Sequence, residues 1–251
     1  MIRVDAFTIQ IAGLTARVQP LFSSTREYCR SYLTDDAPDV YVEVTKPDLA
    51  VTQALLEREA VEDGIRVRKF PEPFLERATI QRKIALELIT RNTILLHGSA
   101  VGLDGEAYLF TAPCGTGKST HTRFWREMFG HRAVMVNDDK PFLQITSSGV
   151  IAYGSPWSGK HGLDSNISLP LKGICFLRRG TANRIHPVTP EKYFDELCRQ
   201  SVFPEDSSGR RKALALVNAL AQVIPLWEME CTKDPLAAFV SYQAMSAGQK
   251  F

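Results

Sequence analysis

The residues best suited to chemistry form the segment Ala112-Pro-Cys-Gly-Thr-Gly-Lys-Ser-Thr120. It follows the phosphate-binding pattern GxxxxGKS/T, known as the P-loop or Walker A pattern, with Ala112 at the first glycine position. Glycines can adopt the positive φ angles that let a backbone wrap around phosphate oxygens with its N–H groups pointing inward. Lys118 can neutralise the β and γ phosphates, and the Ser119 hydroxyl can bind Mg²⁺. The segment therefore predicts a nucleotide site formed by Pro113, Cys114, Gly115, Thr116, Gly117, Lys118, Ser119 and Thr120.

A glycine-rich turn without a ligand would have a similar composition, so the neighbouring sequence matters. An apolar segment, DGEAYLFTAP, runs into the loop, and a helical segment follows it. A strand that feeds a glycine loop at the start of a helix favours a phosphate site, because the helix dipole adds positive charge there. His121 lies in this helix and could face either phosphate or solvent.

A pair of carboxylates follows the next apolar segment, where RAVMV leads into Asn137, Asp138, Asp139 and Lys140. Adjacent like charges repel, so such a pair is costly unless a cation or a reacting hydroxyl uses it. We expect Asp138 to bind Mg²⁺ together with Ser119, and Asp139 to act as the base that accepts a proton from a hydroxyl. The reverse assignment of the two aspartates is equally compatible with the sequence, and a solvated turn is the alternative without chemistry.

Two further candidates for the chemistry are His97 and Lys160. His97 lies in LLHGSAV, where a strand could end at the site, although an isolated histidine beside an apolar strand is often structural. Lys160 belongs to YGSPWSGKHG, whose small residues suit a loop carrying a cation and an aromatic platform, Trp157. Simple packing of Trp157 and a surface position for Lys160 are the alternatives. Arg178 and Arg179 end the segment GICFLRR, where they could reach phosphate or only make the strand end soluble.

These segments lie in a region, residues 91–251, that alternates between strand and helix patterns. Further strands are expected at PFLQIT, VIAYG, GICFLRR and PLWEMEC, and helices at 190–201, 210–222 and 234–247. Residues 1–90 read as a smaller mixed α/β unit with strands at FTIQI, LTARV, VYVEV and GIRVRKF and helices at PDLAVTQALLEREA and 77–91. The fold class predicted is α/β, or mixed α+β, with the chemistry in the second unit.

Composition excludes several classes of function. The chain has 251 residues and a formal charge of +2, with its basic residues scattered, so neither nucleic acid nor a membrane is an expected partner. Its first residues lack the apolar stretch of a signal peptide, which predicts a cytoplasmic protein. The five cysteines are widely spaced and lack a CxxC, so we expect neither a disulfide framework nor a zinc site.

In their order and spacing, LLHGSAV, a hairpin, GTGKST and VNDDKP resemble the catalytic domain of HPr kinase/phosphorylase, in the clan that includes phosphoenolpyruvate carboxykinase. The resemblance covers residues 92–180. It implies a P-loop core in which His97 matches the family's histidine-glycine pair, and Lys118 and Ser119 match its loop residues. It also implies that Asp138 and Asp139 serve metal binding and phosphoryl transfer, one of them as base toward a serine hydroxyl.

The chain also departs from that family. Ala112 replaces the first loop glycine, and YGSPWSGK stands where HPr kinases typically carry a glutamate-bearing metal motif. The N-terminal unit does not resemble that of HPr kinase. The resemblance therefore implies the phosphoryl-transfer machinery without implying HPr as the acceptor.

We accordingly expect a kinase that uses ATP and Mg²⁺ to phosphorylate a hydroxyl, such as a serine of a protein, a peptide or a small molecule. Two other functions fit the same residues. A non-catalytic regulatory protein could retain the loop for nucleotide binding, and the missing glutamate favours it, whereas the presence of both aspartates opposes it. Phosphorolysis or phosphatase action would use the same site in reverse. Relatives form rings and dimers, so the resemblance also allows a homo-oligomer.

Overall fold

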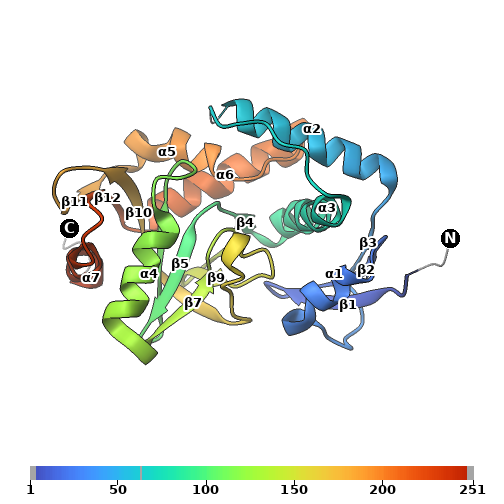
Figure 1. Ribbon diagram of the computed structural model, residues 1–251, viewed down its shortest axis with the longest axis horizontal. Coiled ribbons are helices and arrows are strands. Elements are labelled where there is room, and N and C mark those ends of the chain that lie inside the picture. Colours follow the sequence, from blue (N-terminus) through green and yellow to red (C-terminus); the bar gives the residue numbers. More distant parts are fainter. Residues whose placement is uncertain (1–3, 63, 248–251) are drawn as a thin grey trace. The chain divides into compact units, whose positions relative to one another are not determined.

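The computed structural model describes residues 4–62 and 64–247. They form two compact units, Met1–Leu88 and Ile89–Phe251. In Figure 1 the first unit runs from blue to teal and the second from green to red.

The first unit contains a three-stranded sheet and helices. Strands β1 (Phe7–Ile11) and β2 (Leu14–Gln19) are antiparallel, and β3 (Val40–Glu43) lies parallel to β2 on the other side. The helical elements are α1 (Ser24–Tyr28), η1 (Arg30–Tyr32), α2 (Lys46–Glu62) and α3 (Glu72–Leu88). Glu76 of α3 is fully buried, and its carboxylate accepts hydrogen bonds from the backbone N–H of Leu21 and from the hydroxyl of Thr25. This buried contact fixes the start of α1 to α3.

The strand predicted at GIRVRKF is wrong, because residues 65–70 form neither strand nor helix. The side chain of Gln53 in α2 replaces a neighbouring strand as hydrogen-bond partner. Its amide donates to the Arg68 carbonyl at 2.8 Å and accepts from the Phe70 N–H at 3.0 Å. Ile65 and Val67 are exposed, so the alternating pattern has no buried face here.

The second unit is built on a nine-stranded mixed sheet, in the order β4-β8-β9-β10-β6-β5-β7, with β12 beside β10 and β11 beside β12. The strands are β4 (Thr93–Leu95), β5 (Ser99–Leu103), β6 (Glu106–Thr111), β7 (Ala133–Asn137), β8 (Phe142–Thr146), β9 (Gly149–Tyr153), β10 (Ser168–Arg179), β11 (Arg184–Val188) and β12 (Leu226–Cys231). The mixed α/β architecture predicted from the sequence is confirmed.

The long strand β10 joins two parts of this sheet. Its first residues, Ser168–Pro170, pair antiparallel with β9, whereas its second half pairs parallel with both β6 and β12. The register on β6 shifts between Leu171 and Gly173, where the strand changes partners. As a result, the carboxyl ends of β6, β10 and β12 lie side by side, and β6 leads directly into the predicted phosphate loop.

Helices cover this sheet: α4 (Lys118–Phe129), α5 (Pro190–Arg199), α6 (Ser207–Val223) and α7 (Leu236–Ala247), with short turns η2 (Ile89–Arg91), η3 (Gly130–Arg132) and η4 (Gly159–His161). Helix α7 packs beside α4, as Figure 1 shows. The indole N–H of Trp125 in α4 donates to the Ser241 hydroxyl of α7 at 2.9 Å, and Trp125 packs against Tyr108 and Phe110 of β6. This aromatic core fixes the helix that follows the loop.

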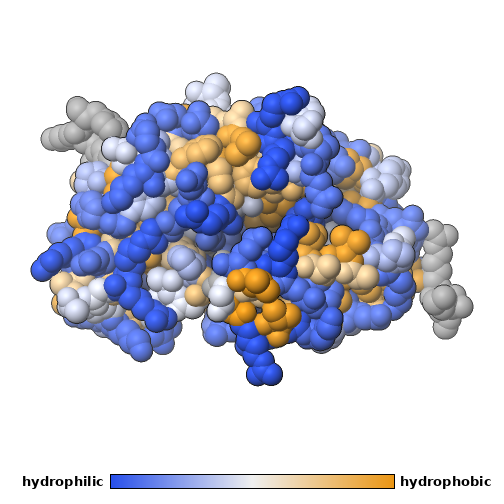
Figure 2. Space-filling model, turned by 90° about the horizontal axis from the view of Figure 1, so that it is seen from above, coloured by the Kyte–Doolittle hydropathy of each residue, from blue (hydrophilic) through white to orange (hydrophobic). Residues whose placement is uncertain are grey.

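The face of the molecule in Figure 2 is mostly hydrophilic, with several hydrophobic areas among the polar residues. Among the residues described, no helix is both long enough and apolar enough to span a membrane.

Candidate functional site

The phosphate loop connects β6 to α4 with the backbone shape that its glycines allow. Gly115 and Gly117 have φ angles of 76° and 124°, in the region that favours glycine. Ala112 is buried and keeps a φ outside that region, so an alanine fits at the first position of the pattern. Lys118 is almost fully buried, and its Nζ donates to the Ala112 carbonyl at 2.8 Å. Ser119 and Thr120 follow in the first turn of α4.

Asp138 is held by a chain of buried hydroxyls that reaches the helix of the loop. Its Oδ1 accepts a hydrogen bond from the Ser99 hydroxyl of β5 at 2.6 Å. The Ser99 hydroxyl lies 2.8 Å from that of Thr122, one turn after Lys118 in α4. Ser99, Thr122 and Asp138 are all at most 5% exposed. The predicted metal ligand is therefore fixed to the phosphate loop's own helix.

His97 and Asp139 are brought together because the strand predicted over TILLHGSAV is interrupted. It splits into β4 and β5, and the intervening Gly98 N–H donates to the Asp139 carbonyl at 3.0 Å. The Nε2 of His97 then lies 3.2 Å from Asp139 Oδ1. The Asp139 side chain keeps about a third of its surface exposed, so an incoming group can reach it.

The surrounding charges set the protonation of this pair. The positive charge of Lys140, followed by burial, lowers the pKa of His97 to about 4, despite the opposing contact with Asp139. Burial alone would raise the pKa of Asp139, but the hydrogen bond from His97 and the charge of Lys140 outweigh it and lower that pKa. At neutral pH the site therefore contains a neutral imidazole donating to a carboxylate.

Asn137 fixes the turn that carries both aspartates. It is fully buried, and its Oδ1 accepts from the backbone N–H groups of Asp139 and Lys140 at 2.8 and 2.5 Å. Its Nδ2 donates to the carbonyl and hydroxyl of Ser155 at 2.8 and 3.0 Å. This role of Asn137 was not predicted from the sequence, although an asparagine just before such a turn is a known turn signal.

The segment that contains Lys160 lies beside Asp139. A Cβ added to Gly159 would be 3.2 Å from the Cβ of Asp139, so only a glycine fits there without displacement. Lys160 follows in η4 and is exposed. Trp157 is 5% exposed and packs edge-on against Phe142, so it belongs to the core and the predicted aromatic platform is wrong.

The two arginines at the end of β10 have different partners. Arg178 forms ion pairs with Glu196 of α5 and with Glu228 of β12. The guanidinium of Arg179 instead donates to the Gly115 carbonyl of the phosphate loop at 2.6 Å. Arg178 therefore stabilises the packing of α5 on the sheet, whereas Arg179 belongs to the site.

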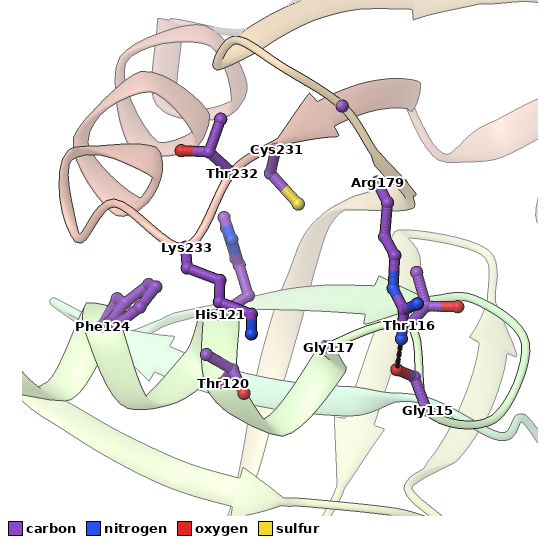
Figure 3. A pocket seen from close by; sticks show the side chains of 11 residues that line it. Gly115, Thr116, Gly117, Thr120, His121, Phe124, Arg179, Cys231, Thr232 and Lys233 are labelled. Carbon is purple, nitrogen blue, oxygen red and sulfur yellow. Dashed lines mark hydrogen bonds between the residues drawn. The ribbon is translucent and has the colours of Figure 1, made fainter.

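A cavity of about 500 Å³ opens on the side of the loop that faces β10 and β12. Figure 3 shows Arg179 extending into it from the end of β10 and Lys233 extending from the chain after β12 toward α4. His121 lines its inner wall but is 2% exposed, and its Nε2 lies 2.9 Å from the Ser241 hydroxyl. Burial lowers the pKa of His121 to about 3, so this almost fully buried side chain is neutral at physiological pH.

Comparisons with known proteins give a match among solved structures. No protein-family model matches the sequence, and no curated protein matches it. Among solved structures, the chain is similar to the HPr(Ser) kinase/phosphatase from Coxiella burnetii, with 11% sequence identity and a TM-score of 0.33. The match covers 61% of this chain and 99% of that one.

The side chains near Asp138 include oxygen atoms that could bind a magnesium ion. The described residues contain no group of three or more His, Cys, Asp and Glu side chains placed to bind a metal. Mg²⁺ in phosphate-transferring sites is commonly held by one or two carboxylates together with the phosphates of the substrate. Asp138 and the Ser119 hydroxyl, at the start of the same helix as Thr122, fit that smaller donor set.

Proposed function

We propose that the chain is an ATP- and Mg²⁺-dependent kinase with an HPr-kinase-like core, and that it transfers the γ-phosphate to a hydroxyl. The observation that carries the proposal is the hydrogen-bonded chain from Asp138 through Ser99 to Thr122. It couples a buried carboxylate to the helix that follows a glycine loop in which Gly115 and Gly117 have positive φ angles. A metal-bound polyphosphate needs both of these features at a fixed separation.

The loop would bind the phosphates through its backbone N–H groups and Lys118. Lys118 would exchange its hydrogen bond with the Ala112 carbonyl for one with a phosphate oxygen. Asp138 and Ser119 would hold Mg²⁺, which supplies positive charge to the phosphates when it is bound. Lys160 would add a further cation from the segment beside Asp139.

Asp139 would act as the base. The acceptor's O–H proton passes to the Asp139 carboxylate while the oxygen bonds to the γ-phosphorus, and the bond from that phosphorus to the β-phosphate oxygen breaks, releasing ADP. The neutral His97 donates to Asp139 Oδ1 and would orient the carboxylate toward the acceptor. Positioning of this kind supplies most of the rate in phosphoryl transfer.

A direct test is to incubate the purified protein with Mg²⁺ and γ-labelled ATP, alone and with free serine, serine-containing peptides or a cell extract. Mass spectrometry then identifies each labelled species. A labelled hydroxyl compound supports the kinase and names its acceptor class. Tight ATP binding with no label on any acceptor or in water would instead favour the non-catalytic regulatory protein.

The variant Asp139→Asn separates the base from the nucleotide site. Loss of a general base commonly costs about 10² to 10⁴ in rate. We expect transfer to fall by about that factor while the dissociation constant for ATP changes less than about threefold. Unchanged transfer by Asp139→Asn would reject Asp139 as the base, and Asp138→Asn would then be examined in the same assay.

A further inference from the structure

The cavity beside the phosphate loop shares its wall with the loop itself. It is lined by Gly115, Thr116, Gly117, Thr120, His121, Phe124, Arg179, Gly180, Cys231, Thr232 and Lys233. Three of these residues, Gly115 to Gly117, belong to the loop. A group occupying the cavity would therefore be adjacent to any phosphate bound there. The Asp139 side chain, by contrast, is not among the lining residues.

We propose that this cavity binds the nucleoside part of the nucleoside triphosphate, with Arg179 and Lys233 as the residues that recognise it. The proposal rests on the function proposed above, because it takes the phosphates to lie on the loop. It separates the site into a nucleoside side, facing β10 and β12, and an acceptor side, at His97 and Asp139.

The size and lining of the cavity suit a base and a ribose. Its volume of about 500 Å³ lies within the range of roughly 300 to 1,000 Å³ that small-molecule sites commonly have. Phe124 supplies apolar surface, and Thr120 supplies a hydroxyl. A polyphosphate alone would use only the loop, whereas this combination suits an apolar ring attached to a polar sugar.

The two cations enter the cavity from different strand ends. Arg179 is held at 2.6 Å on the Gly115 carbonyl, and Lys233 is exposed on the segment after β12. A planar guanidinium can stack on a base, and an ammonium can donate to a ribose hydroxyl. Because both line the cavity beside the loop, they would contact the base and the ribose.

The wall that carries these cations is held firmly. Arg179 pairs with Cys231 in the parallel register of β10 and β12. The preceding Arg178 is anchored by its ion pair with Glu196. A Cβ on Gly180 would lie 2.9 Å from the Cβ of Glu230, so the chain needs a glycine where it leaves β10. The side of the cavity formed by Arg179 and Cys231 therefore belongs to the sheet.

Calorimetric titration with three probes tests the proposal: Mg-ATP, Mg-tripolyphosphate and adenosine. Lys233→Ala removes an exposed side chain, so it should fold normally, and Thr232→Trp would partly fill the cavity. Each should weaken ATP binding by about tenfold, the size of effect expected for truncating or blocking one well-placed contact. Binding of tripolyphosphate should change less than about twofold. Lys192→Ala, an exposed lysine on α5, is the matched control.

The outcomes distinguish this proposal from the function on which it rests. Lys118→Ala should weaken both ATP and tripolyphosphate. If it does so while Lys233→Ala and Thr232→Trp bind ATP normally, the nucleoside lies elsewhere and only the cavity proposal is overturned. If the unaltered protein binds neither ATP nor tripolyphosphate, the proposed function itself is overturned.

Two cysteines provide a second readout that needs no substitution. Cys114 is exposed in the loop, whereas Cys231 lines the cavity and is partly buried. Alkylation followed by mass spectrometry should show Cys114 protected by both ATP and tripolyphosphate. Cys231 should be protected by ATP alone. Equal labelling of Cys231 with either probe would contradict a nucleoside in the cavity.

Discussion

At the residue scale, the proposed base and its neighbour are one charged carboxylate, Asp139, and one neutral histidine, His97. His97 stays neutral because Lys140 and burial both oppose its protonation, and Asp139 stays ionised because His97 and Lys140 stabilise its charge. A base that is already ionised at neutral pH needs no preceding proton transfer. Through its contact with Asp139, the histidine would orient the carboxylate without being charged.

This arrangement predicts the pH dependence of transfer. Because His97 has a pKa of about 4 and the pKa of Asp139 is lowered, neither changes protonation between pH 8 and about 5.5. We expect kcat/KM to show no inflection near 6.5, the ordinary histidine pKa, and to fall only at more acidic pH. An inflection near 6.5 that disappears in His97→Gln would show that His97 titrates, and would contradict this account.

A second histidine affects stability rather than chemistry. His121 has a folded-state pKa of about 3, below the ordinary 6.5. The unfolded chain can protonate this histidine below about pH 6.5, whereas the folded protein cannot until the pH nears 3. The free energy of unfolding is therefore highest above about pH 6.5 and decreases as the pH falls from there toward the folded-state pKa. At pH 5 His121 should account for about 2 kcal/mol of lost stability. Urea unfolding at pH 7 and pH 5 measures this, and His121→Gln should show a smaller difference between the two pH values than the unaltered protein.

At the scale of elements, β5, α4 and the end of β7 meet through the hydroxyl of Ser99. Replacing it with alanine removes the donor to Asp138 and leaves a buried carboxylate with one partner fewer. We expect Ser99→Ala to lower stability by about 1 to 3 kcal/mol and to weaken the enhancement of ATP binding by Mg²⁺. Calorimetric ATP titrations with and without Mg²⁺ give that enhancement. Ser148→Ala, in the exposed turn between β8 and β9, is the control. If the two variants have the same stability and the same Mg²⁺ enhancement of ATP binding, Ser99 does not position Asp138.

The sequence predicted the elements whose signals are local. The glycine loop, its helix and the aspartate turn follow from residues that are neighbours in the chain. The contacts of Ser99 with Asp138 and of Arg179 with Gly115 join residues 39 and 64 positions apart, and no local pattern encodes them. The strand predicted at GIRVRKF failed for a related reason, since the distant Gln53 side chain supplies its hydrogen bonds.

At the scale of the whole molecule, the candidate site lies entirely in one of two compact units. Every residue assigned to the nucleotide, the metal or the base belongs to Ile89–Phe251. The other unit, Met1–Leu88, has its own sheet and its own buried polar contact at Glu76. Nucleotide binding and any contribution of the first unit can therefore be measured separately.

We expect a fragment comprising residues 89–251 to fold and to bind Mg-ATP within about threefold of the full chain, because a compact unit with its own core commonly folds alone. Circular dichroism and calorimetry would check folding and affinity in turn. A fragment that folds but no longer binds ATP would show that the first unit is required by the nucleotide site.

The hydrogen bonds that Lys118 and Arg179 make to the carbonyls of Ala112 and Gly115 also affect competition among anions. An anion that uses either cation must first displace a bond that the loop already makes to itself. A single small anion can replace few of these contacts, whereas a chain of linked phosphates can replace several at once. Inorganic phosphate, although abundant in cells, should therefore be a poor competitor, and affinity should rise steeply from mono- to di- to triphosphate.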